Sequence, residues 1–288
     1  MDIEEVADNA IDQLAGSMKV DGPTATSSHV CYVVHGISET PEQIENLCWC
    51  LLGFLGRIFE IDLSIDSAIG QGAQAEANLL GALKKRLHVD KELSEEQKQR
   101  NRDPLLQELI AHTLLVVHRR QGRFHQWLGE LRAFRPPHLS ANQSGLDLIA
   151  VGVHDGFLVP LIGEVKSTEN GPLDGLCDAC AKFSQVRKGE YDDELREAIK
   201  SMDCGFTKEQ LAKNIWVSTS RFGAVVGHDQ QHCFDPTCAS QASQVLEQPS
   251  DRLFLVAAPY PSIRAYFDAL SDELVRLAKK LGESDDAG

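Results

Sequence analysis

An Asp-Gly pair between two apolar runs is the feature that most constrains the fold of this 288-residue chain. The pair is Asp155-Gly156, and the runs span 146–153 and 157–165. Asp-Gly in such a setting is a strong signal for a β-hairpin with a two-residue loop, and that loop fixes the register of the two strands. Both runs are apolar on both faces, which is typical of strands near the middle of a sheet. The sequence therefore predicts a buried hairpin.

The register of this hairpin brings charged side chains together. With Asp155 and Gly156 in the loop, Asp147 lies opposite Glu164. Lys166 points to the same side as Glu164, because side chains alternate along a strand. Two carboxylates that face each other in a buried sheet repel, and one would hold a proton unless a cation lies between them. The sequence therefore predicts a cation-binding cluster at one end of the hairpin.

A divalent ion with oxygen ligands would remove this conflict, since Mg²⁺ uses one or two carboxylates together with substrate phosphates. Lys166 would then orient or deprotonate the attacking water, or steady the developing charge. The alternative is purely structural. In that case Asp147 and Glu164 mark a strand end, and Lys166 is a solvated terminus or a salt-bridge partner.

The sequence also indicates the cellular compartment of the protein. No run approaches the ~18 apolar residues that a membrane span needs. The acidic start, Met-Asp-Ile-Glu-Glu, lacks the basic and apolar pattern of a signal peptide. These features predict a cytoplasmic protein with no membrane partner. In that reducing compartment the eight cysteines are expected to be thiols or metal ligands rather than disulfides.

The net charge of −15 bears on nucleic-acid binding. A protein that grips DNA alone usually shows a basic stripe, because neutralising phosphates supplies most of the affinity. The nearest basic stretch is 118–138, which holds five arginines and one glutamate. It is either a phosphate-facing edge or a solvated surface. The acid excess predicts that a partner protein delivers any DNA substrate.

The chain divides at a polar segment. Residues 1–27 show no clear period after a first helix-like turn and are predicted to be a loosely held arm. A β-rich stretch at 29–34 and a helix beginning at Thr40-Pro41 follow it. Residues 88–103 are almost wholly polar and are predicted to be a linker. We therefore expect an N-terminal α/β subdomain over 1–100 and a second domain over 104–288.

The second domain alternates helices and strands. Asp103-Pro104 begins a helix, and the hairpin lies in the middle of the domain. The other elements predicted for this domain are a strand within 124–134, helices at 190–202 and 207–215, a strand at 252–258 and an amphipathic helix from Ser262. In the N-terminal subdomain a further helix is predicted within 66–87. The order from 104 onward is thus helix, strand, hairpin, helix, strand, helix.

Asp147 together with Glu164-x-Lys166 resembles the motif of the PD-(D/E)XK nuclease superfamily, which carries an Asp on one strand of a hairpin and Glu-x-Lys on the next. The order of elements is also similar to the αβββαβ core of that superfamily, over roughly 104–281. The resemblance implies an α/β fold with a restriction-endonuclease-like core. One departure is that Leu146, not Pro, precedes the Asp.

The resemblance also implies roles for individual residues. Asp147 and Glu164 would be metal ligands and Lys166 the catalytic lysine, with Mg²⁺ as the ion and Mn²⁺ as its substitute. The superfamily often adds an acid from the preceding helix, and Glu108 is the candidate for this further ligand. The implied substrate is DNA. Three polar side chains that follow the Glu-x-Lys strand are candidates for phosphate contact: Lys182, Gln185 and Lys188.

The Glu-x-Lys strand followed by Asp-Glu-Leu-Arg-Glu-Ala-Ile-Lys at 193–200 is similar to the nuclease subunit of Hachiman-type anti-phage defence. This resemblance implies a helicase partner that restrains the nuclease. The chain has no Walker-type loop, so an ATP-driven step would belong to another subunit. Two alternatives stand beside it: a stand-alone restriction or repair nuclease of the same fold, and a non-catalytic subunit whose long C-terminal helix is the working surface.

A second group of candidate ligands lies outside this motif. Cys177-x-x-Cys180 has the spacing of a zinc half-site. The other half would come from a polar stretch with little to bury, which contains His228, His232, Cys233 and Cys238. The two halves could hold one zinc ion; otherwise these residues are loop thiols and incidental histidines.

Overall fold

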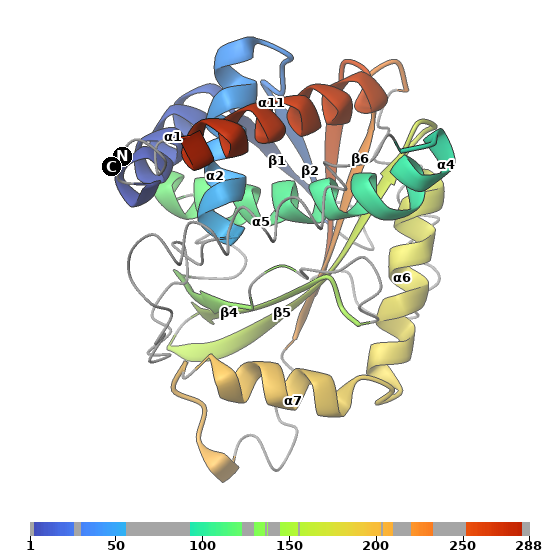
Figure 1. The fold of residues 1–288 in the computed structure, drawn as a ribbon. Coiled ribbons are helices and arrows are strands. Elements are labelled where there is room, and N and C mark those ends of the chain that lie inside the picture. Colours follow the sequence, from blue (N-terminus) through green and yellow to red (C-terminus); the bar gives the residue numbers. More distant parts are fainter. Residues whose placement is uncertain are drawn as a thin grey trace.

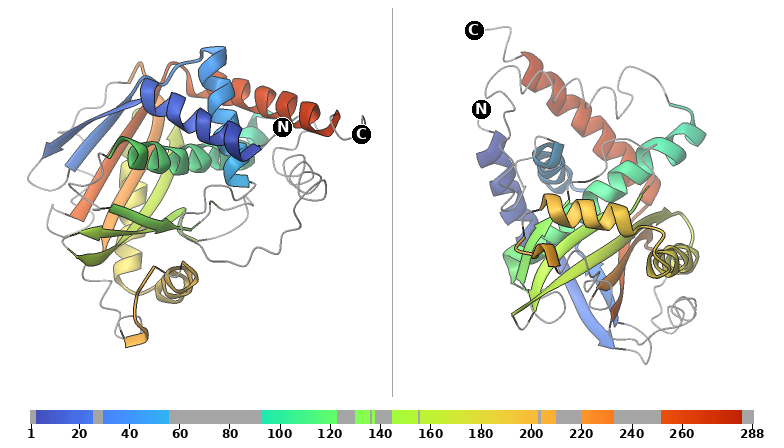
Figure 2. Two further views of the ribbon diagram at one scale, coloured as in Figure 1. Left: turned by 90° about the vertical axis from the view of Figure 1, so that its left-hand side faces the viewer. Right: turned by 90° about the horizontal axis from the view of Figure 1, so that it is seen from below.

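Seven strands form one sheet with helices on both of its faces (Figure 1; two further views in Figure 2). The strand order is β1-β2-β7-β6-β5-β4-β3. The structure is a computed structural model that describes residues 3–25, 30–55, 93–122, 130–135, 137, 145–154, 156–202, 204–209, 220–232 and 252–283. Among the helices in these ranges, none is long and apolar enough to cross a membrane.

The strands are β1 (Lys19–Ala25), β2 (Val30–His35), β3 (Glu130–Phe134), β4 (Leu148–His154), β5 (Phe157–Thr168), β6 (Arg221–Asp229) and β7 (Leu253–Tyr260). The helices are α1 (Ile3–Ser17), α2 (Pro41–Leu55), α4 (Glu95–Gln97), the π-helix η1 (Lys98–Arg102), α5 (Asp103–Gln121), α6 (Leu173–Arg187), α7 (Asp192–Ser201) and α11 (Ile263–Glu283). Strands β2, β7, β6 and β5 are parallel neighbours, whereas β1 and the β5-β4-β3 end pair antiparallel. The predicted mixed α/β class is confirmed.

Two apolar cores lie on opposite faces of the sheet. Along β4, Leu148 and Ala150 belong to the core that contains residues of α1, α2, α5 and α11. Ile149 and Val151 belong to the core that contains residues of α6 and α7. Because successive side chains of a strand point to opposite faces, the parts of the hairpin strands that lie between the two cores have to be apolar on both sides. This explains the unbroken apolar runs in the sequence.

The predicted hairpin is present in the predicted register. His154 pairs with Phe157, and the ladder continues to Leu148 opposite Gly163. Gly156 has φ +79°, a turn conformation that favours glycine. Asp155 itself lies outside the described residues. Since the positions of each pair sum to 311 throughout, the loop chemistry alone was enough to set the register.

The prediction of a loosely held arm at 1–27 is wrong. Residues 3–17 form helix α1, which buries Ala7, Ala10, Ile11 and Leu14 in the core. Strand β1 follows and pairs with β2. Two of these four buried residues are alanines, so the apolar face of α1 is only weakly marked in the sequence. Helix α1 packs against α2 and α5, and this tertiary packing stabilises it more than its local sequence does.

The N-terminal elements do not form a core of their own. Strand β2 pairs with β7, so it belongs to the same sheet as the hairpin. Helices α1 and α2 share one apolar cluster with α5 and α11. Part of the predicted linker, 95–102, is helical and runs directly into α5. The elements on the two sides of the predicted boundary at 88–103 are therefore joined through one sheet and one core.

Two elements were absent from the sequence-based prediction. Residues 173–187 form α6, and residues 221–229 form β6 between β5 and β7. The predicted helix at 190–202 and strand at 252–258 are present as α7 and β7. The predicted helix at 66–87, and positions 210–215 of another, lie outside the described residues.

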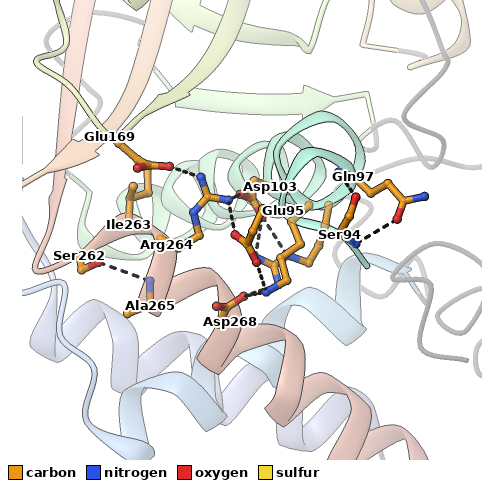
Figure 3. A network of polar contacts seen from close by, with 12 residues as sticks. Ser94, Glu95, Gln97, Asp103, Glu169, Ser262, Ile263, Arg264, Ala265 and Asp268 are labelled. Atoms are coloured by element: carbon orange, nitrogen blue, oxygen red, sulfur yellow. Dashed lines mark hydrogen bonds and ion pairs between the residues drawn. The ribbon is translucent and has the colours of Figure 1, made fainter. Parts of the chain in front are cut away.

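A network of ion pairs joins the start of α5, the start of α11 and the end of β5 (Figure 3). Arg264 contacts Glu169, which follows β5, and its Nη1 lies 3.3 Å from Asp103 Oδ2. Arg102 contacts Asp103 at 2.8 Å and Asp268 at 2.5 Å. This network fixes the end of the strand that carries Glu164 and Lys166 relative to both long helices.

Candidate active site

The hairpin brings the three predicted residues together. Lys166 Nζ donates a hydrogen bond to Glu164 Oε2 over 2.8 Å and lies 3.9 Å from Asp147 Oδ2. Glu164 and Lys166 are two residues apart in β5, and Asp147 directly precedes β4. All three point to the face of the sheet that α6 and α7 cover, as their parity with Ile149 and Ile162 requires.

Asp147 is tied to the neighbouring strand. Its Oδ2 accepts a hydrogen bond from the backbone N–H of Val165 over 2.7 Å. The side chain keeps a quarter of its surface exposed, at 25%, and Lys166 keeps 32%, whereas Glu164 is only 2% exposed. The cluster therefore has one buried carboxylate and an open side through which an ion or a phosphate can approach.

Glu164 has an unused oxygen. Its Oε2 accepts from Lys166, but Oε1 is buried and has no hydrogen-bond partner within the described residues. Burial raises the pKa of Glu164, and the nearby Asp147 carboxylate raises it further, while Lys166 and then Lys182 act in the opposite direction. A buried polar atom without a partner costs about 1–3 kcal/mol. Such an atom is frequently explained by a functional role or by a bound ion.

Lys166 carries a stable positive charge in this arrangement. Burial by itself would lower the pKa of Lys166, but the Glu164 and Asp147 carboxylates raise it above its ordinary value. An ammonium group has three donors and no lone pair. In this state the side chain can orient a water molecule or stabilise negative charge, and it cannot accept a proton.

Helix α6 covers the cluster. A side-chain Cβ built at Gly175 would lie 3.2 Å from Lys166 Cβ, so this glycine lets the helix approach the strand closely. Lys182, one of the predicted phosphate contacts, donates to the carbonyl of Gly145 over 3.1 Å and lies over the ring of Tyr191, 4.7 Å from its centroid. Lys182 therefore comes from α6 to the segment that precedes Asp147.

Glu108 does not join this cluster. It is buried on α5, within the helical layer that packs on the face carrying Leu148. Asp147 and Glu164 point to the other face. Across the described ranges, no group of three or more His, Cys, Asp or Glu side chains is close enough to hold a metal. Glu108 thus belongs to the helical layer on the opposite face of the sheet from the two other acids, and its expected role as a third ligand stays a prediction.

The zinc prediction falls partly outside the described residues. Cys177 and Cys180 are free cysteines one turn apart on α6. Burial raises the pKa of Cys180 to about 12, which disfavours the thiolate that zinc requires. His232 follows β6, but Cys233 and Cys238 are not among the described residues. The proposed pairing of the two halves therefore stays a prediction.

Sequence reasoning missed two residues at this site. Glu194 on α7 and Arg135, directly after β3, form an ion pair that contacts the backbone of Leu146. Arg135 had been noted only as part of a basic stretch, and Glu194 only as part of a helix. No local signal links two residues 59 positions apart. Their association depends on the fold.

Comparisons of this chain with protein-family models, with curated proteins and with solved structures found no match. The functional argument therefore depends on the geometry and chemistry of the site.

Proposed function

We propose that this chain is a metal-dependent deoxyribonuclease of the PD-(D/E)XK type, which hydrolyses phosphodiester bonds in DNA. The observation that carries the proposal is the meeting of Asp147, Glu164 and Lys166 at one end of a buried hairpin, with the Nζ of Lys166 2.8 Å and 3.9 Å from the two carboxylates. The buried Glu164 oxygen that has no partner within the described ranges supports the proposal, because a bound cation would satisfy it.

The order of elements supports the same proposal. Helix α5 is followed by the antiparallel strands β3, β4 and β5, then by helices α6 and α7 and by β6, which runs parallel to β5. This succession agrees with the αβββαβ arrangement that we expect for a restriction-endonuclease-like core. In this proposal helix α6 and strand β6, which the sequence did not predict, would be the last helix and strand of that core.

The residues present fit a hard divalent cation. Asp147 and Glu164 offer carboxylate oxygens, and Mg²⁺ commonly takes only one or two carboxylates while water and substrate phosphates complete its six ligands. These two residues would hold Mg²⁺, or Mn²⁺ in its place. A bound Mg²⁺ would supply Lewis-acid polarisation of the phosphate and an acidified water ligand.

The chain's own side chains and backbone would bind the phosphate and position the Asp147 carboxylate. The ammonium of Lys166 would donate hydrogen bonds to the phosphate oxygens or to the attacking water, and would stabilise the negative charge that develops on the phosphate oxygens. Lys182 adds a second positive charge near the two acids, and its pKa is raised by Tyr191, Glu164 and Asp147 against the effect of burial. The Val165 N–H holds the Asp147 carboxylate in place.

Cleavage of supercoiled plasmid and of linear duplex DNA by the full chain tests the proposal. We expect cleavage with Mg²⁺ or Mn²⁺, none with EDTA, and loss of cleavage in Asp147→Asn and Glu164→Gln. Lys200→Met serves as a control on an exposed residue of α7. Cleavage by a folded Glu164→Gln variant at the wild-type rate would contradict the assignment and favour a non-catalytic subunit.

We further propose that DNA reaches the site through a helicase partner, as in an anti-phage defence complex. The support is the net charge of −15, which opposes binding to a polyanion by this chain alone. Filter binding of labelled duplex to the isolated chain at physiological salt is the test. Tight binding without any partner would favour a stand-alone restriction or repair nuclease instead.

A further inference from the structure

One ion pair occupies both polar backbone atoms of the residue that precedes Asp147. Glu194 Oε1 accepts hydrogen bonds from the N–H of Leu146 over 3.0 Å and from Arg135 Nη1 over 2.7 Å. The Nη2 of Arg135 donates to the carbonyl oxygen of Leu146. The peptide groups on either side of Leu146 are thus fixed by a carboxylate and a guanidinium that also bind each other.

The same segment is held from a third direction. Lys182 on α6 donates to the carbonyl of Gly145 over 3.1 Å. A Cβ at Gly145 would lie 2.6 Å from Glu194 Oε1, closer than real Cβ contacts. Only glycine leaves room for the Glu194 carboxylate to reach this backbone. Groups from three separate parts of the chain therefore converge on two residues.

Asp147 needs such support because the sheet does not supply it. The hairpin ladder ends with Leu148 opposite Gly163, so Asp147 lies one residue beyond the paired strand. Its own carboxylate is tied to β5 through the Val165 N–H, but its backbone depends on the segment before it. The side chains of Arg135 and Glu194 are 19% and 25% exposed. Hydrogen bonds to charged groups in such partly buried places stabilise by about 1.5–3 kcal/mol.

We infer that Arg135 and Glu194 are positioning residues that hold the Asp147 carboxylate where it can bind the divalent cation. The inference rests on the proposed nuclease function, because it assigns these residues to the metal site. In this inference neither residue is itself a ligand of the ion. Their effect passes through the backbone of Leu146. Outer groups that orient metal ligands in this way typically contribute 10–100-fold to metal affinity.

Binding of Mn²⁺ to the full-length chain, measured by electron paramagnetic resonance without DNA, tests the inference. We expect Glu194→Ala to raise the Kd for Mn²⁺ at least about tenfold. Asp193→Ala is the matched control, since it removes the same charge from the adjacent position of α7 and breaks only the exposed pair with Arg196. That control should bind Mn²⁺ as the wild type does.

Two further variants separate positioning from folding. Glu194→Gln keeps an acceptor for the Leu146 N–H and should recover part of the affinity. Gly145→Ala keeps both charges but displaces the Glu194 carboxylate, so it should weaken Mn²⁺ binding as Glu194→Ala does. These two variants serve even if Glu194→Ala fails to fold.

Wild-type Mn²⁺ affinity in folded Glu194→Gln and Gly145→Ala, with or without a lower melting temperature, would overturn the inference while leaving the proposed function intact. The proposed function fails separately. It fails if the wild type does not bind Mn²⁺, or if Asp147→Ala binds it unchanged, and the inference then fails with it.

Discussion

Lys166 Nζ and Glu164 Oε2 lie 2.8 Å apart on one strand, at the end of a hairpin whose other strand is preceded by Asp147. The contact gives the buried carboxylate one charged partner and leaves its second oxygen unpaired among the described residues. It also places a permanent cation beside the two acids. This geometry separates the groups that can bind a metal from the group that can only stabilise charge.

Replacing the lysine should therefore uncouple catalysis from metal binding. Lys166→Met removes the ammonium and keeps both carboxylates, so we expect cleavage of plasmid DNA to slow by about 10²–10³-fold, as when one preorganised donor is lost. Mn²⁺ binding should persist. The measurement is single-turnover cleavage at saturating Mn²⁺, with Lys200→Met as the control. An unchanged rate would remove Lys166 from the mechanism.

The raised pKa of Glu164 predicts a stability that depends on pH. Burial and the Asp147 charge make the ionised form unfavourable in the folded state, so the folded pKa lies above the unfolded one. The protonated Glu164 side chain therefore contributes most to the stability of the wild type below the unfolded pKa of about 4.3. This contribution to the free energy of unfolding is lost as the pH rises through the folded pKa.

Chemical denaturation in EDTA between pH 4 and 8 measures this difference. We expect Glu164→Gln to be the more stable protein at pH 7, since the amide carries no charge to desolvate. The advantage should shrink toward pH 4. A Glu164→Gln variant that is less stable than wild type at pH 7 would show that the ion pair with Lys166 outweighs burial.

The hairpin was predictable because loop type and strand parity are local rules. Asp155-Gly156 sets the register, and from it follows the side to which Asp147 and Glu164 point. Strand β6 was not predictable in the same way. Its glycines weaken a strand in isolation, yet Gly227 lies where a Cβ would come 2.4 Å from Gln107 Oε1 of α5. That contact is made only after folding.

The site was predictable only where it is local. The three residues of the hairpin cluster are close in register, whereas Glu108 was expected to join them from its place in the chain order alone. The sheet separates its layer from theirs, which no spacing in the sequence reveals. The Arg135–Glu194 pair was missed for the converse reason, since it spans 59 positions and three elements.

Helix α1 provides a test of the corrected N-terminal region. Ile11 is fully buried in the core that α2 and α5 share, so Ile11→Ala should lower the free energy of unfolding by about 2–5 kcal/mol. Gln13→Ala changes an exposed side chain of the same helix and should have little effect. Urea unfolding measures both. Equal stability of the two variants would support the original prediction that residues 1–27 are a loosely held arm.

The network around Arg264 predicts a contrast between two arginines of α11. Arg264 is 22% exposed and connects Glu169, which follows β5, with Asp103 at the start of α5. Arg264→Ala leaves the largely buried Asp103 with one partner fewer, and burial is the main cause that raises the pKa of this acid. We expect a loss of about 1–3 kcal/mol.

Arg276→Ala is the matched change on the same helix. Arg276 pairs with Glu273 and Glu45, but its own side chain is 53% exposed, so water and salt screen these pairs and its loss should hardly alter stability. Thermal unfolding of both variants at low and high salt distinguishes the two environments. The Arg264 effect should survive high salt, because Asp103, one of its partners, is only 8% exposed and the protein shields this pair from ions. If both variants lost the same amount and salt abolished both effects, the Arg264 network would be no more than a surface ion pair.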